Sequence, residues 1–322
     1  MSFMSSSMHK LAACVVSIML SAFVLAPATQ AQYYEEDGPP ITLDATWDGS
    51  TRFTALILGL DRRPGARNNF NARADVILLA SYSPFERRVG VLSIPRDMHF
   101  PDSVTGELLR VNTLLVEGEA IREGYGPYYA METLQNNLGM IIDAYVIFDF
   151  EAFTTLIDAI GGVRVDVPYA ISDPTFPDMN YGYSPFFVSA GVQTFNGERA
   201  LKYARTRHGD NDYARGRRQL QILQGVYERL SDPARLQDLV IKAPGLLRDL
   251  SGHLYSNLPA NDAIYLGLSM IDIDLQDITT GAMDADYSFN YEASGAGTVR
   301  VPDRNRLISL MIDVFGANYI SR

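Results

Sequence analysis

The chain has 322 residues, 47% of them hydrophobic, which is enough apolar material for one large domain or two medium ones. Its formal net charge is −11 and its pI is about 4.8, so its surface repels nucleic acid and anionic membranes on average, and we expect no nucleic-acid partner. Any anionic ligand must therefore be bound by a local cluster of positive charge.

The N-terminal segment has the features of an export signal. Lys10 precedes a largely apolar run without charged residues over residues 11–26, and Thr29 and Ala31 are small residues that suit a cleavage point. The run is shorter than the roughly 20 residues of a spanning helix; an uncleaved membrane anchor is the alternative. Because Cys14 in this run is the only cysteine, the domain that follows has no disulfide and no thiol chemistry.

We therefore expect residues 1–31 to be a signal peptide or membrane anchor. Residues 32–50 are acidic and contain Gly and Pro, which suits a short tether. The rest of the chain is then extracytoplasmic, either secreted or anchored at the outer face of the cytoplasmic membrane.

Three strand patterns follow in quick succession. Residues 53–60 form a continuous apolar run, and the runs at 76–80 and 89–94 are joined by a turn short enough to make them antiparallel. If the first strand lies parallel to the third, the C-terminal ends of these two strands and the N-terminal end of the second meet at one edge of a sheet. That rim would carry Asp61, Arg73, Asp75 and Arg96.

The middle of the chain alternates helix and strand patterns. Helical patterns at 127–138 and 151–160 flank a strand at 144–150, and another strand follows at 163–167. This order predicts a crossover unit and an α/β domain built in layers. Residues 168–190 are rich in proline and aromatic residues without a clear period, so they are either a cap over a site, which we favour, or a mobile loop.

The C-terminal third is mostly helical by pattern. We expect helices near 219–231, 236–250 and 260–271, a strand near 276–281 and a terminal helix over 303–315. No obvious chemical motif lies in these segments.

Residues 203–219 gather positive charge in an otherwise acidic chain. In a helix over 214–230 the apolar stripe continues backwards onto Arg215, Arg218 and Gln219, whereas Arg217 lies off it. Buried guanidinium groups need anionic partners, and a helix N-terminus favours phosphate.

Two further arginines precede this helix. Arg205 and Arg207 share one side of a segment expected to be extended, and both could point to the same place. The alternative is that Asp210, Asp212 and nearby carboxylates pair the arginines internally.

These residue types suit phosphoryl transfer. The reaction needs cations that hold the phosphates and a geometry that aligns the acceptor. Two carboxylates with a hard metal such as Mg²⁺, together with a fork of arginines, meet that need. Motifs of other catalytic classes are missing from the sequence, which has no GxSxG, no HExxH and no Walker loop.

Several segments resemble the signature blocks of the LytR-CpsA-Psr family, in the family's order. They are GLDRR (59–63), RAD (73–75), SIPRD (93–97), IDAIGGVRVDVP (157–168) and ALKYARTRHGDNDYARGRRQ (200–219), followed by the terminal VPDRNRLISLMIDVF. The resemblance implies one catalytic domain over residues 51–322, with an α-β-α layered fold around a central mixed β-sheet.

The resemblance also implies a function. Members of the family are membrane-associated phosphotransferases that move a glycopolymer from a polyprenyl-pyrophosphate carrier to peptidoglycan, with a divalent metal, Mg²⁺ or Mn²⁺. A long apolar groove for the carrier's tail is implied too, although the sequence does not identify the residues that line it.

The resemblance assigns roles to individual residues. Asp61 and Asp75 are implied as metal ligands, and Asp75, Arg73, Arg96 and Asp212 as the catalytic set. The residues implied around the pyrophosphate are Arg62, Arg73, Arg96, Arg205, Arg207, Arg215 and Arg218, with Asp212 and Gln219 as orienting partners. Arg62 and Arg63 compete for one family position, and Val76 stands where the family usually has Thr.

Two other functions remain open at this stage. The same arginines would serve a pyrophosphatase that transfers the phosphoryl group to water. A non-catalytic protein that binds polyprenyl phosphates and regulates envelope assembly would need the arginines but not both carboxylates.

Overall fold

The computed structural model describes residues 47–62, 70–103, 105–178, 182–206, 212–230, 248–259, 275–293 and 297–320, together with separate residues between 231 and 275. The predicted signal or anchor, and all but the last residues of the predicted tether, lie outside these ranges. Within them, no helix combines the length and the apolar character that crossing a bilayer would require.

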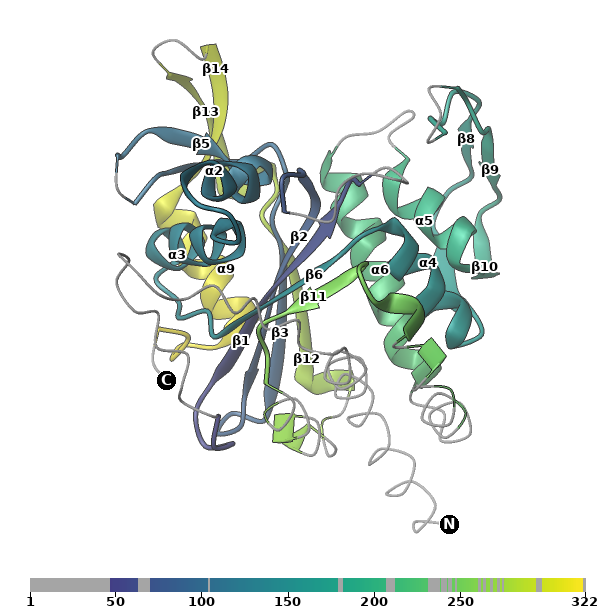
Figure 1. The fold of residues 1–322 in the computed structure, drawn as a ribbon, viewed down its shortest axis with the longest axis horizontal. Coiled ribbons are helices and arrows are strands. Elements are labelled where there is room, and N and C mark those ends of the chain that lie inside the picture. Colours follow the sequence, from purple (N-terminus) through teal and green to yellow (C-terminus); the bar gives the residue numbers. More distant parts are fainter. Residues whose placement is uncertain are drawn as a thin grey trace.

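A mixed sheet of six strands forms the centre of the fold, in the order β11-β6-β1-β2-β3-β12 (Figure 1). β1 is antiparallel to β2, and β2 is antiparallel to β3, so β1 and β3 are parallel as expected. β6 runs parallel to β1 and the edge strand β12 parallel to β3, whereas the other edge strand, β11, is antiparallel to β6. The strands span β1 Phe53–Leu60, β2 Ala74–Ser83, β3 Arg88–Ser93, β6 Ala144–Phe148, β11 Leu254–Ser256 and β12 Ile278–Ala282.

Helices lie on both sides of this sheet, which confirms the predicted α/β layered fold (Figure 1). One side has α2 (Leu114–Ile121), α3 (Gly126–Leu138) and α9 (Arg304–Phe315); the other has α4 (Phe150–Ala159), α5 (Gly197–Arg205) and α6 (Asp212–Leu230). α9 approaches the sheet closely because Gly90 of β3 has no side chain: a Cβ there would lie 2.5 Å from the ring of Phe315.

The two faces of the sheet have different surroundings. Because side chains alternate along a strand, Leu56, Leu58 and Leu60 of β1 belong to the core shared with α2, α3 and α9. Phe53 and Ala55 point the other way, into a cluster that includes residues of β2 and β3 and borders α6. The second face is the one that forms the candidate site.

The predicted crossover unit is wrong in one respect. β7 (Val163–Val167) is absent from the central sheet and pairs antiparallel with β10 (Gly191–Phe195) in a small separate sheet beside α6. The physical reason is visible in the sequence VRVDV, whose Arg and Asp are exposed while the valines are buried. A parallel strand covered on both faces would be apolar throughout.

Other predicted elements are present, with some changes. α6 begins at Asp212, and residues 168–190 contain a β-hairpin of β8 (Ile171–Asp173) and β9 (Phe186–Val188). The helices expected at 236–250 and 260–271 fall largely outside the described residues. Elements that the sequence did not predict are α2, α5, the strands β8 to β11, β4 His99–Pro101, β5 Leu108–Arg110, β13 Ser288–Ala293 and β14 Gly297–Pro302, with short 3-10 turns at Val111–Thr113, Leu275–Asp277 and Ala285–Tyr287.

Candidate functional site

A β-bulge shapes the predicted rim of the sheet. The pairing of β1 and β2 steps from Gly59↔Val76 to Leu60↔Ala74, which leaves Asp75 as the extra residue. Bulges change the direction of a side chain at the edge of a sheet. The backbone N–H of Asp61 donates to the carbonyl of Arg73 at 3.0 Å, so Asp61 stays beside β2 and both carboxylates line one cavity.

Arg96 lies just beyond β3 and pairs with Asp75. Its Nη1 donates to both carboxylate oxygens, at 2.6 and 2.7 Å, and both side chains are largely buried. Charge-assisted hydrogen bonds of this length are strong and directional. Since Arg96 also lines the cavity, the pair presents one carboxylate and one guanidinium group at the same wall.

Arg205 is held between an aromatic ring and a carboxylate. It is the last residue of α5, so the prediction of an extended segment here is wrong. Its Cζ lies 4.1 Å from the ring centroid of Phe150 and 5.6 Å from that of Phe176, and its Nη2 lies 3.8 Å from Asp61 Oδ1. Burial lowers the pKa of Arg205 below its ordinary value, Asp61 and Asp75 act in the opposite direction, and Arg96 lowers it further.

The first turns of α6 bring Arg215 and Arg217 to the cavity. Arg215 and Arg218 are buried, Gln219 is half-buried and Arg217 is exposed, which confirms the predicted stripe. Arg215, Arg217 and Gln219 line the cavity, so Arg217 contributes from outside the stripe. The helix can begin this close to β3 because a Cβ at Gly216 would lie only 3.0 Å from Ser93 Oγ.

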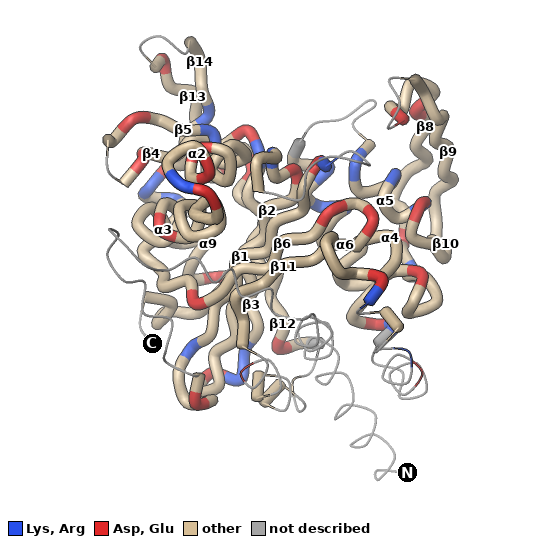
Figure 2. Tube along the Cα trace, in the orientation of Figure 1, with Lys and Arg blue, Asp and Glu red and all other residues tan. Residues whose placement is uncertain are grey.

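The cavity has a volume of about 1070 Å³ and lies between α6 and the second face of the sheet. Asp61, Asp75 and the arginines occupy the end near the rim, and in Figure 2 acidic and basic positions of the backbone trace lie close together near the upper end of β2. The remainder is lined by apolar side chains, among them Phe53, Ala55, Ile57, Leu78, Ala80, Val89, Val91, Leu220, Leu223, Leu266 and Met270. From Gly59 to Phe53 the apolar wall runs for roughly 20 Å at strand spacing, which suits a ligand with an anionic head and a long apolar tail.

Residues of the 168–190 segment form part of the cavity wall. Asp173, Thr175, Phe176 and Pro177 line it, as expected of a cap. Asp173 is buried and accepts a hydrogen bond from the hydroxyl of Thr206 at 2.6 Å. Sequence reasoning did not single out Asp173, Phe176, Phe150 or Arg217; the aromatic residues of this segment were the only available signal.

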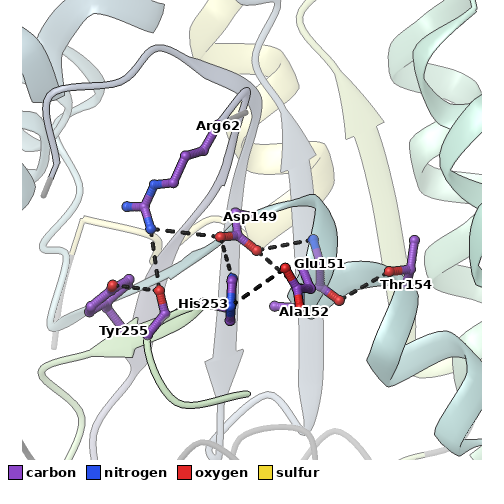
Figure 3. A network of polar contacts seen from close by, with 8 residues as sticks. Arg62, Asp149, Glu151, Ala152, Thr154, His253 and Tyr255 are labelled. Atoms are coloured by element: carbon purple, nitrogen blue, oxygen red, sulfur yellow. Dashed lines mark hydrogen bonds and ion pairs between the residues drawn. The ribbon is translucent and has the colours of Figure 1, made fainter. Parts of the chain in front are cut away.

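Three predicted phosphate ligands lie away from the cavity wall. Arg73 is exposed and is not among the lining residues. Arg62 is buried and its Nη1 is directed toward Asp149 at 3.6 Å (Figure 3). Arg218 donates from Nε to the carbonyl of Tyr203 at 3.0 Å and from Nη2 to that of Thr206, at the C-terminal end of α5. Arg63, Arg207 and the side chain of Asp212 lie outside the described residues.

Arg218→Lys is expected to cost about 1–3 kcal/mol of unfolding free energy, because an ammonium group cannot reach both carbonyls and one is left buried without its donor. Urea unfolding of the variant, with Arg217→Lys as the exposed control, measures this. Unchanged stability with weakened binding of pyrophosphate would instead make Arg218 a phosphate ligand.

The carboxylates of the rim suit a divalent ion whose remaining coordination positions are filled by phosphate oxygens and water. Across the described residues there is no group of three His, Cys, Asp or Glu side chains able to hold a metal by themselves. Asp61 and Asp75 supply two carboxylates to one cavity. Mg²⁺ is commonly held by one or two carboxylates plus phosphate oxygens and water, so this pair suits such an ion.

Comparisons with known proteins point in one direction. A sequence model of the LytR_cpsA_psr family matches residues 22–303. Polyisoprenyl-teichoic acid–peptidoglycan teichoic acid transferase TagV of Bacillus subtilis is 28% identical over 236 residues, which are 70% of this chain and 56% of that protein. Regulatory protein MsrR of Staphylococcus aureus strain COL is 28% identical over 221 residues, 68% of this chain and 60% of that protein. Each match spans less than two thirds of the relative's own length.

Solved structures share the fold. The crystal structure of B. subtilis TagV superposes with a TM-score of 0.62 at 24% identity, covering 81% of this chain and 94% of that one. A structure of TagT bound to LIIa-WTA gives a TM-score of 0.58 at 22% identity, covering 90% and 98%. At these identities the likeness establishes the architecture.

Proposed function

The chain belongs to the LytR_cpsA_psr family, and on that premise we propose that it is an extracytoplasmic phosphotransferase. Its donor would be a glycopolymer on a polyprenyl-pyrophosphate carrier, and its acceptor a hydroxyl group of peptidoglycan. The names of matching relatives, teichoic acid transferases of the genus Bacillus among them, support this class of donor and acceptor.

The observation that carries the proposal is the shape and polarity of the cavity. Its charged end contains Asp61, Asp75 and four arginines, and its apolar wall continues from there along β1, β2 and α6. A pyrophosphate would lie among Arg96, Arg205, Arg215 and Arg217, while the carrier's tail would lie along Ile57, Leu78 and Ala80. A polyprenyl lipid with a phosphorylated head group combines these two features.

The reaction proposed for this site is an in-line displacement at phosphorus. An acceptor hydroxyl oxygen forms a bond to the phosphorus that bears the glycan, and the bond from that phosphorus to the bridging oxygen breaks. Polyprenyl monophosphate leaves with the bonding electron pair, and the hydroxyl proton ends on the departing phosphate. The arginines neutralise the charge that gathers on the phosphate oxygens, which is the main contribution a protein can make to this chemistry.

Asp61 and Asp75 are the residues that would hold Mg²⁺ or Mn²⁺, which would supply additional neutralisation of phosphate charge when bound. Arg96 now occupies both oxygens of Asp75, so it would share this carboxylate with the ion or turn toward the phosphate. A protein that only binds the carrier needs the arginines but has no use for a second carboxylate, and the pair therefore favours an enzyme.

The experiment that tests the proposal incubates the protein with Mg²⁺, a polyprenyl-pyrophosphate-linked glycan and a soluble peptidoglycan fragment. We expect polyprenyl phosphate and a phosphodiester-linked glycan on the fragment, with both products lost in EDTA. Release of glycan phosphate into water despite the acceptor would identify a pyrophosphatase. Tight binding of the donor without turnover in Mg²⁺ or Mn²⁺ would identify a carrier-binding protein.

A further inference from the structure

Asp149 connects three segments of the chain (Figure 3). It is buried and caps α4, where its Oδ1 accepts from the backbone N–H groups of Glu151 and Ala152, both at 3.1 Å. Its Oδ2 faces Arg62 Nη1 at 3.6 Å and His253 Nδ1 at 2.8 Å. One carboxylate therefore joins the start of α4, the segment after β1 and the residue before β11.

Arg62 is held in this network by contacts other than the carboxylate as well. Its Nη1 donates to the carbonyl of Gly252 at 3.3 Å, and its Cζ lies 5.6 Å from the ring centroid of Tyr255. The Tyr255 hydroxyl donates to the same carbonyl at 2.6 Å. These contacts direct the guanidinium of Arg62 away from the cavity.

The chain neighbours of this ion pair hold a different arginine. Asp149 precedes Phe150, on whose ring Arg205 stacks at 4.1 Å, and Arg62 follows Asp61, whose carboxylate lies 3.8 Å from Arg205. Two of the groups that contact Arg205, the ring of Phe150 and the carboxylate of Asp61, are thus adjacent in sequence to the two members of the Arg62–Asp149 pair. Movement of either member would shift the ring or the carboxylate that fixes Arg205.

We propose that Arg62 and Asp149 act as positioning residues, a brace that sets the position of Arg205 at the charged end of the cavity, and that Arg62 is not itself a phosphate ligand. The positioning role does not depend on the proposed function. The statement that Arg62 is not a phosphate ligand does rest on it. His253 supports the brace from the edge of the sheet, since the backbone N–H of Asp149 donates to its carbonyl at 3.1 Å. Misplacement of a charged group by about 1 Å can cost on the order of a hundredfold in rate, so such a brace matters for catalysis.

Two substitutions test the brace without requiring any ligand. Asp149→Asn keeps an oxygen to cap α4 but replaces the carboxylate that faces Arg62, and Arg62→Gln removes the opposite charge. The readout is the NMR resonance of the Arg205 Nε–H group, identified by its loss in Arg205→Lys. We expect it to move, in both variants, toward the position of an unstacked arginine.

Asp303→Asn is the matched control. Asp303 caps α9 in the same way, with Oδ1 accepting from the backbone N–H groups of Asn305 and Arg306, and it pairs with the Arg306 side chain at 3.6 Å. This variant should leave the Arg205 resonance in place. An equal shift in the control, or no shift in either brace variant of confirmed folded structure, would overturn the proposal.

Binding of farnesyl pyrophosphate supplies a second readout. Because residues in one contact network are not additive, Arg62→Gln, Asp149→Asn and the double variant should each bind about tenfold more weakly than the wild type. Additive losses, or a loss in Arg62→Gln alone, would show that Arg62 contacts phosphate directly and would overturn the proposal. A wild-type protein that fails to bind this probe while the Arg205 resonance responds would refute the proposed function and leave the brace intact.

Discussion

Asp75→Asn is expected to lower the turnover number for glycan transfer by about a thousandfold or more. The substitution removes one of the two carboxylates at the rim and the partner of Arg96, whose Nη1 bonds both oxygens of Asp75. Loss of a single group that stabilises charge in the transition state commonly costs a hundredfold to a thousandfold. Loss of a bound metal adds to this. The measurement is the initial rate of polyprenyl phosphate release at saturating donor.

Asp97→Asn is the matched control for this variant. Asp97 is more exposed, lies 3.6 Å from Nε of the same Arg96 and pairs with Arg110 at 3.5 Å, but it is not among the residues that line the cavity. Its substitution should change the rate by less than a few fold. If Asp75→Asn retained wild-type turnover, or if both variants lost it equally, the rim would not be the site of the chemistry.

The rim was predictable because it depends on local rules. A short turn makes two neighbouring strands antiparallel, and this brings Asp75 and Arg96 to one edge of the sheet whatever the rest of the chain does. Asp61 followed from the parallel placement of β1 and β3. The bulge that makes Asp75 the extra residue was not predicted, although Gly59 in an otherwise apolar strand was an available signal, because an isolated glycine in a strand often marks a bulge.

Side-chain direction was harder to predict than position. The buried stripe of α6 correctly placed Arg215 and Arg218 inside, but helical spacing does not distinguish an arginine that faces a cavity from one that donates to backbone carbonyls. Arg62 likewise lies at the rim by sequence yet faces Asp149. Its partners are contributed by segments that no spacing rule connects to residue 62, around residues 149 and 252.

The apolar part of the cavity was not predictable for a related reason. Phe53, Ala55 and Ile57 alternate along β1 with Leu56 and Leu58, so both sets look like core in a continuous apolar run. Only the position of α6 relative to the sheet decides that one set meets packed helices and the other meets a cavity. That position depends on packing of residues distant in the sequence.

Ala80→Trp is expected to make activity depend on the length of the donor's polyprenyl tail. Ala80 lines the cavity in the middle of β2 and pairs with Ala55, four residues from Gly59 at the rim, which is roughly 13 Å at strand spacing. An indole at this position would fill the cross-section beyond that point. Donors with a long polyprenyl tail should then show a KM raised by about a hundredfold, because a large apolar surface loses its burial.

A donor with a geranyl tail provides the internal control. Its two isoprene units need only the part of the cavity nearest the rim, so its turnover by Ala80→Trp should match that by the wild type. If the variant and the wild type turn over the short donor equally, misfolding is excluded as the cause of the loss with the long one. Ala80→Ser should turn over both donors at the wild-type rate. Unchanged turnover of the long donor would mean that the tail does not extend past Ala80 and that the apolar wall between α6 and the sheet has another purpose, whereas equal losses with both donors would show that the substitution damages the whole site.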